Sequence, residues 1–173
     1  MLTKEQKKWI AHLSDEDKVS IVPFDPTSKE KFQKVKHRVR GILGKSVSVE
    51  HHGATSLGIS GQDEIDIYVP TLEKDFNQRV SEFETIFGKS RSHYLLERAR
   101  FVTEGDGKHI DVFVINGESN GWNTMIKFES YLREHPDSLE AYRQLKEDCQ
   151  GMSTRKYYRR KIEFINEILS SSN

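Results

Sequence analysis

Residues 47–70 read Val-Ser-Val-Glu-His-His-Gly-Ala-Thr-Ser-Leu-Gly-Ile-Ser-Gly-Gln-Asp-Glu-Ile-Asp-Ile-Tyr-Val-Pro. This stretch predicts a strand over Val47 to His51, a loop of small residues and a second strand that begins near Glu64. Apolar and polar residues alternate along the second strand, so one set faces a core and the other set faces the opposite side. The apolar set is Ile65, Ile67 and Val69, and the polar set is Glu64, Asp66 and Tyr68.

The loop between these strands contains four small residues in a row, Gly53-Ala54-Thr55-Ser56. Their backbone N–H groups and hydroxyls are suited to a phosphate. A carboxylate on the following strand, Asp66, is suited to hold a divalent metal ion against that phosphate, which is the layout that phosphoryl and nucleotidyl transfer require. The alternative is a turn that only joins two strands, with Asp66 as a solvated surface residue.

Four blocks of the chain resemble the GrpB family. The first is Glu50-His51-His52-Gly53-Ala54-Thr55-Ser56 followed by Asp66-Ile67, which is similar to the family pattern Glu-His-apolar-Gly-Ser-Thr and then Ile-Asp-Ile. The other blocks are Val22 to Pro26, Phe128 to Pro136, and a closing helix with Tyr158, Lys161, Phe164 and Ile165. Because the blocks follow the family's order, the resemblance covers nearly the whole chain from about Ser20.

The GrpB family sits in the nucleotidyltransferase superfamily, which shares the catalytic fold of DNA polymerase β. The resemblance therefore implies an α/β (α+β) protein with a mixed β-sheet flanked by helices and a helical C-terminal third. It also implies a nucleoside triphosphate ligand with Mg²⁺ or Mn²⁺. Carried over by position, the catalytic and metal-binding residues are Asp66 and Asp111, and the nucleotide-binding residues are Gly53, Ala54, Thr55, Ser56 and His51.

Two residues depart from the superfamily pattern. Ala54 stands where a second glycine or serine is usual, and Tyr68 stands where a second carboxylate is usual. A neutral phenol is a poor ligand for a hard cation such as Mg²⁺, so Glu64 on the same strand face is the available substitute. Two hypotheses follow: a nucleotidyltransferase with an unknown acceptor, or a non-catalytic module that binds a nucleotide or another phosphorylated molecule.

The later sequence supplies the second candidate carboxylate. Strands are predicted over Tyr94 to Val102 and over Lys108 to Ile115, joined by a glycine-rich hairpin turn that includes Asp106. Asp111 lies on the polar face of the second of these strands, together with His109. Three helices are predicted from about Gly121 onward, which accounts for the helical C-terminal third.

Composition limits the other function classes. Lys plus Arg and Asp plus Glu both total 27, so no overall charge attracts nucleic acid or an anionic membrane. The single cysteine, Cys149, excludes an internal disulfide and a cysteine-rich zinc site. No apolar run is long enough to cross a membrane, so a cytoplasmic protein is expected. The histidines follow no zinc-site spacing, although a mixed histidine and aspartate site remains an alternative.

The predicted organisation is one domain over residues 19–173, preceded by a helical extension over residues 1–18. Five cations crowd the start of the last helix, which leaves a partner-binding basic face as a third hypothesis. They are Arg155, Lys156, Arg159, Arg160 and Lys161. The acceptor, the choice of nucleotide and the oligomeric state are left open at this point.

Overall fold

The computed structural model describes residues 1–105 and 107–171, which form two compact units. The helical unit comprises Met1–Pro23, Ile59–Gln62 and the described residues from Ile126 onward. The sheet unit comprises Phe24–Gly58 and the described residues from Asp63 to Met125. The predicted α/β class and the helical C-terminal region are confirmed, whereas the predicted boundary after residue 18 stays a prediction.

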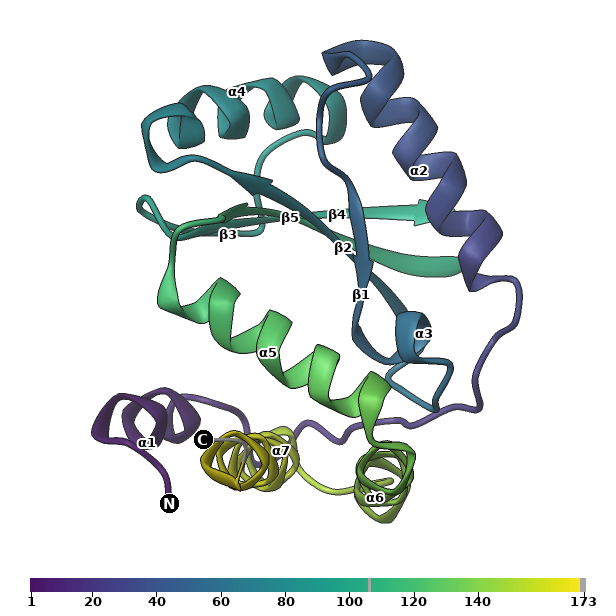
Figure 1. Cartoon of the computed structure of the whole chain (residues 1–173), viewed down its shortest axis with the longest axis vertical. Helices are drawn as coiled ribbons and strands as arrows, with labels where there is room; N and C mark the ends of the chain where they lie inside the picture. Colours follow the sequence, from purple (N-terminus) through teal and green to yellow (C-terminus); the bar gives the residue numbers. More distant parts are fainter. Residues whose placement is uncertain (106, 172–173) are drawn as a thin grey trace. The chain divides into compact units, whose positions relative to one another are not determined.

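A mixed five-stranded sheet forms the centre of the sheet unit, in the order β1-β2-β5-β4-β3 (Figure 1). β2 and β5 are parallel, and the other neighbours are antiparallel. The predicted hairpin is present between β4 and β5, where Gly105 lies opposite Lys108, while Asp106 lies outside the described residues. The strands are β1 (Glu50–His52), β2 (Glu64–Thr71), β3 (Ser92–Tyr94), β4 (Arg98–Gly105) and β5 (Lys108–Asn116).

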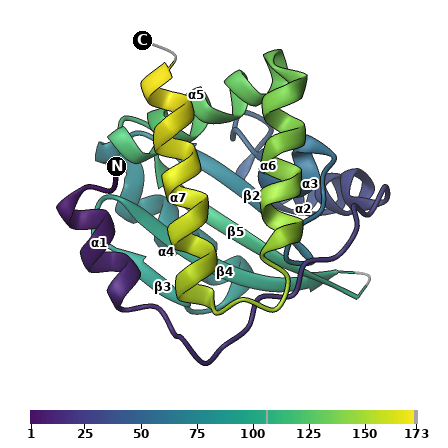
Figure 2. The same cartoon turned by 90° about the horizontal axis from the view of Figure 1, so that it is seen from below.

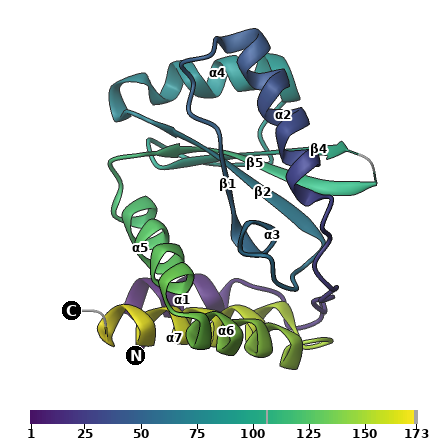
Figure 3. The same cartoon turned by 45° about the vertical axis from the view of Figure 1, so that its right-hand side comes forward.

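One face of this sheet carries the hydrophobic core, beneath helices α2 and α4 (Figures 1 and 3). The apolar residues of β2 that the alternation predicted, Ile65, Ile67 and Val69, are all buried on this face. They pack with aromatic and β-branched residues of the two helices, and this burial is the main force that holds the unit together. The helical elements wholly within the unit are α2 (Ser28–Leu43), α3 (Gly53–Leu57), the 3₁₀ turn η1 (Glu73–Asp75) and α4 (Phe76–Phe87).

The helical unit is built from α1, α6, α7 and the second half of α5. α7 lies between α1 and α6 (Figure 2), and aromatic pairs join them. Trp9 meets Tyr158 edge to face with ring centroids 5.3 Å apart, and Tyr142 stacks on Phe164. Cys149 is buried in this unit. The bounds are α1 (Lys4–Ala11), α5 (Asn120–Glu134), α6 (Pro136–Asp148) and α7 (Thr154–Ser171).

A charged contact fixes the start of α2. The Lys31 Nζ lies 2.8 Å from the Asp25 carboxylate, which also accepts hydrogen bonds from the backbone and hydroxyl of Thr27. The hydrogen bond from Lys31, followed by those from Thr27, holds the pKa of the Asp25 carboxyl well below its ordinary value of 3.8. The folded state therefore favours the ionised form of Asp25 more strongly than the unfolded chain does.

This contact predicts a pH effect on stability. Because the pKa of Asp25 is lowered by folding, its stabilising contribution is present above about pH 4 and is lost as the pH falls below that value. In urea unfolding, we expect the parent protein to lose more free energy of unfolding than Asp25→Asn between about pH 5 and about pH 2. The exposed Glu134 provides the control, Glu134→Gln, which should follow the parent. Parallel pH curves for the parent and Asp25→Asn would contradict this assignment.

Candidate functional site

The two predicted carboxylates lie side by side in the sheet. In the parallel register of β2 and β5, Asp66 is the direct partner of Asp111. Their neighbours along the same face are also paired, Glu64 with His109 and Tyr68 with Phe113. Because register partners project to the same side of a sheet, these side chains share the face opposite the hydrophobic core. We call this surface the polar face.

Three potential metal ligands converge on the polar face. One ligand atom each from Glu64, His109 and Asp111 lies within 4.8 Å of the other two. The His109 Nε2 is 3.0 Å from the Asp111 Oδ1, and the Asp111 side chain is only 6% exposed. The Arg100 Nε approaches the same oxygen at 2.9 Å and is buried, yet within the described chain it has no partner at hydrogen-bond geometry. The positive charge of Arg100 therefore offsets the negative charge of Asp111, although the Arg100 Nε–H makes no hydrogen bond of good geometry within the described residues.

This donor set suits a divalent cation. Mg²⁺ prefers oxygen ligands. Glu64 and Asp111 offer carboxylates within the cluster, and Asp66 stands beside Asp111 in register on the adjacent strand. An imidazole nitrogen is a more usual ligand for transition metals such as Mn²⁺, so His109 broadens the choice beyond Mg²⁺. The sequence pointed to Asp66 and Asp111, with Glu64 as a substitute and a mixed histidine and aspartate site as an alternative; His109 lies in the cluster that this alternative describes.

The predicted small-residue loop is a five-residue helix, α3, that begins directly after β1. Gly53 has a φ of 74°, and a Cβ atom at this position would overlap the carboxylate oxygen of Asp66. The backbone of the predicted phosphate-binding segment therefore lies directly against the first candidate metal ligand. Ala54, Thr55 and Ser56 follow within the helix, and the hydroxyl of Thr55 lies 2.9 Å from the Nε2 of His51.

The two histidines of β1 lie on opposite faces of the sheet. His51 is in register with Ile67, and its ring stacks on Phe32 of α2 with centroids 4.9 Å apart. This position is on the core face, away from Asp66, although the sequence grouped His51 with the nucleotide-binding residues. His52 is in register with Asp66 and is buried on the polar face.

Tyr68 occupies an aromatic cluster at the end of the polar face. Its ring stacks on Phe113 with centroids 4.6 Å apart and lies 5.9 Å from Trp122. The ring of His52 meets both Tyr68 and Trp122 edge to face. Stacked and edge-to-face aromatic pairs stabilise a packed cluster, which gives a physical reason for a tyrosine where the superfamily has a carboxylate.

The predicted basic stretch at the start of α7 is partly neutralised within the helical unit. Arg155 pairs with Asp15 and donates to the carbonyl oxygen of Leu13 at 2.9 Å. Arg159 pairs with Glu163 one turn further along the helix. The Arg155 contacts tie α7 to the segment after α1, whereas the Arg159 pair lies within α7 itself. None of the helices in the described part of the chain has the length and apolar character needed to cross a bilayer.

The mixed sheet with paired carboxylates on one face defines the class as an α/β protein with a candidate cation site. Residues 18–171 match the GrpB protein family, and the chain belongs to that family. It is similar to a UPF0157 protein of Vibrio cholerae, with 22% identity over 150 residues that cover 86% of this chain and 79% of that relative. It is also similar to the glutamate-rich protein GrpB of Alkalihalophilus pseudofirmus, with 26% identity over 88% of this chain and 94% of that relative.

A solved structure shares the fold. The crystal structure of conserved protein GrpB from Enterococcus faecalis superposes with a TM-score of 0.66 at 20% sequence identity. The alignment covers 88% of this chain and 98% of that chain. The family and its fold are therefore those that the sequence resemblance implied.

Proposed function

We propose that the polar face binds a nucleoside triphosphate together with a divalent cation, Mg²⁺ or Mn²⁺. The observation that supports this most strongly is the contact between the Gly53 backbone and the Asp66 carboxylate, with Asp111 beside it in register. A phosphate at the start of α3 would lie next to a cation held by Asp66 and Asp111. Glu64 and His109 complete the ligands of that cation.

The proposed reaction is transfer of a nucleotidyl group to an acceptor hydroxyl. A bound cation supplies neutralisation of the phosphate and leaving-group charge. The residues of this chain would position the two reactants: the segment that begins at Gly53 binds the phosphates through its backbone N–H groups, Asp66 accepts the proton of the attacking hydroxyl, and pyrophosphate leaves. Arg100, whose Nε is buried beside Asp111, adds a fixed positive charge to the same face.

A second candidate function is binding of the nucleotide without turnover. The position two residues after Asp66 holds Tyr68, whose ring is packed against Phe113 and Trp122. A two-metal site with one carboxylate replaced by a packed phenol has fewer hard oxygen ligands, and this weakens catalysis more than binding. The aromatic cluster is the observation that favours this alternative.

Calorimetry with ATP in the presence and absence of Mg²⁺ tests the proposal. We expect saturable heat in the parent, and at least a tenfold weaker affinity in Asp66→Asn and Asp111→Asn, because each loses a charged oxygen ligand. Asp75→Asn removes an exposed carboxylate of the same unit at the start of α4 and should leave the affinity unchanged. If no triphosphate binds at millimolar concentration with either cation, both candidate functions are wrong. Release of pyrophosphate under the same conditions distinguishes a transferase from a binding module.

A further inference from the structure

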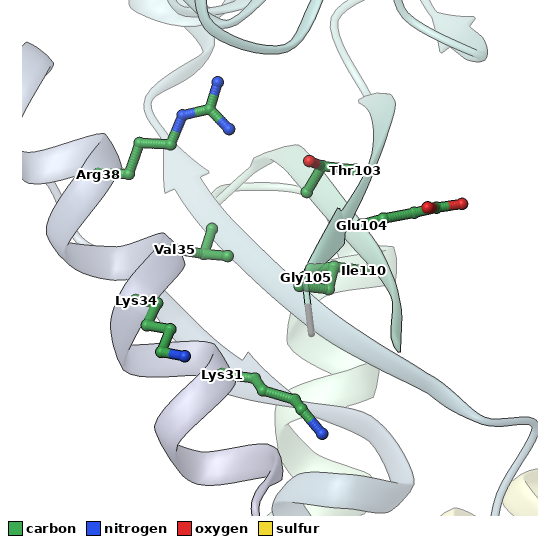
Figure 4. A pocket seen from close by; sticks show the side chains of 8 residues that line it. All are labelled: Lys31, Lys34, Val35, Arg38, Thr103, Glu104, Gly105 and Ile110. Atoms are coloured by element: carbon green, nitrogen blue, oxygen red, sulfur yellow. The ribbon is translucent and has the colours of Figure 1, made fainter. Parts of the chain in front are cut away.

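A pocket lies on the core face of the sheet, between α2 and the hairpin of β4 and β5 (Figure 4). Its volume is about 170 Å³. Thr103 of β4 is the register partner of Ile110, a core residue, so the hollow opens on the core side and away from Asp66. We call it the α2–β4 pocket. Its lining residues are Lys31, Lys34, Val35, Arg38, Thr103, Glu104, Gly105 and Ile110.

Three cations border this pocket from one helix. Lys31, Lys34 and Arg38 are spaced three and four residues apart, which places them on a single face of α2. Like charges at this spacing repel one another, so their alignment toward one pocket is a cost to the isolated helix. The carboxylate of Glu104 points away from α2 (Figure 4), and this residue is the register partner of His109 on the polar face. Three basic side chains of α2 therefore border the pocket, and the one acidic lining residue turns its carboxylate away from them.

Two of these cations are held in fixed positions. The Lys31 side chain is 12% exposed, and its ion pair with Asp25 fixes its position along the wall of the pocket. The Nη2 of Arg38 donates to the carbonyl oxygen of Ile86 at 2.8 Å, and the guanidinium lies 5.0 Å from the centre of the Phe87 ring. Within the described residues, that hydrogen bond uses one of the five N–H donors of a guanidinium. Arg38 is thus pre-oriented beside the pocket with donors to offer.

The opposite wall supplies a hydroxyl and open space. The Thr103 hydroxyl points toward α2 (Figure 4) and, among the described residues, has no hydrogen-bond partner. Gly105 has no side chain, so it leaves this part of the pocket open. A Cβ atom at this position would approach the Ile110 Cδ1 to 3.0 Å. Val35 and Ile110 are both buried and give the pocket an apolar floor. Cations, a free hydroxyl and a small apolar surface together suit an anion that carries a short organic group.

We propose that the α2–β4 pocket binds the phosphate group of a small phosphorylated molecule, at a site separate from the polar face. Arg38 and Lys34 contact the phosphate oxygens, Thr103 donates a hydrogen bond to one of them, and the carbon part rests on Val35. This site does not depend on the nucleotide proposed for the polar face, because the two lie on opposite faces of the sheet. The protein would then hold two phosphate-binding positions in one unit.

Amide chemical shifts of the full ¹⁵N-labelled chain test this proposal, with inorganic phosphate and phenyl phosphate as probes. Each titration is run at constant ionic strength against sodium chloride, which removes general screening effects. We expect saturable shifts at Thr103 and Gly105 with either probe, and tighter binding of phenyl phosphate because its ring covers the apolar floor. Tighter binding of inorganic phosphate would support a site for the free ion and overturn the proposed organic ligand.

Matched variants distinguish phosphate binding in the α2–β4 pocket from general electrostatic attraction of phosphate to the basic residues of α2. Lys34→Gln and Thr103→Val should each weaken binding about five- to tenfold, because each removes a donor to the phosphate. Lys29→Gln removes an exposed cation from the same helix outside the pocket and should change affinity less than about twofold. Asp66→Asn should bind phosphate like the parent even if nucleotide binding is lost. Unsaturable shifts, equal losses in Lys29→Gln and Lys34→Gln, or shifts confined to residues around Gly53 would each overturn the α2–β4 site.

Discussion

Gly53→Ala is expected to abolish cation-dependent nucleotide binding and to lower the thermal unfolding midpoint by several degrees. Gly53 has a φ of 74°, a conformation that costs a residue with a Cβ about 1–2 kcal/mol. The added methyl group would also overlap the Asp66 carboxylate, so either α3 or the carboxylate must move. For a chain of this size, 1 kcal/mol corresponds to a change of about 2–4 °C in the midpoint. Because the backbone strain and the overlap both destabilise the folded state, the midpoint should fall by more than this amount.

Gly58 offers a matched control for this substitution. Its φ is 72°, nearly the same as that of Gly53, but among the described residues no atom lies within 4 Å of a Cβ built there. Gly58→Ala therefore carries the backbone strain without the overlap, and it should retain nucleotide binding. The measurements are thermal melts and ATP calorimetry with Mg²⁺. Equal destabilisation by the two variants, with nucleotide binding intact in both, would show that the contact with Asp66 has no functional importance.

Local alternation was sufficient to predict the two faces of the sheet. The apolar set of β2 is buried, and Asp66 and Asp111 lie on the opposite face because side chains of a strand project to alternate sides. Their direct opposition depends on more than alternation. It requires that β2 and β5 be neighbours, parallel and in one particular register, and these properties belong to the whole fold. The family resemblance supplied that information, since no local pattern in either strand contains it.

The two histidines of β1, His51 and His52, show what strand pairing adds to the local sequence pattern. The sequence predicted a strand over Val47 to His51, whereas β1 runs from Glu50 to His52. A shift of one residue moves a side chain to the other face of the sheet, so adjacent histidines have opposite environments. His51 packs on Phe32 and His52 lies among the aromatic rings beside Asp66. The pairing of β1 with β2 fixes their faces, and it agrees with the alternation of Val47 and Val49, two core residues that precede His51 at even spacing.

The candidate cation site of Glu64, His109 and Asp111 and the α2–β4 pocket also depend on residues that are far apart in the sequence. Glu64 and His109 are far apart in the sequence but are direct partners across the parallel strands. Lys31, Lys34 and Arg38 share one helix face, but they line a pocket only because the hairpin of β4 and β5 lies beside that helix. In both cases residue types were recognisable from the sequence, but their convergence was not. The packing of Tyr68 against Phe113 and Trp122 belongs to the same group of features.

Tyr68→Asp is the second substitution with a large expected effect. The half-buried ring of Tyr68 contacts Phe113, Trp122 and His52, and loss of a packed aromatic ring costs about 3 kcal/mol. The new carboxylate would stand on the same strand face as Asp66, so the two negative charges repel each other. Without metal, we therefore expect a thermal midpoint at least about 6 °C below that of the parent. Tyr68→Phe keeps the ring and should remain within about 1 kcal/mol of the parent.

A magnesium series then tests how this strand is aligned with the nucleotidyltransferase pattern. A carboxylate at position 68 adds a hard oxygen ligand next to Asp66, and a cation that binds only the folded state stabilises it by about 2.7 kcal/mol at one hundred times its dissociation constant. Mg²⁺ should therefore raise the midpoint of Tyr68→Asp more than that of the parent or of Tyr68→Phe, and recover part of the loss. If Mg²⁺ stabilises all three proteins equally, position 68 does not reach the cation. Glu64, His109 and Asp111 would then define the cation site, because their ligand atoms already converge without any contribution from residue 68.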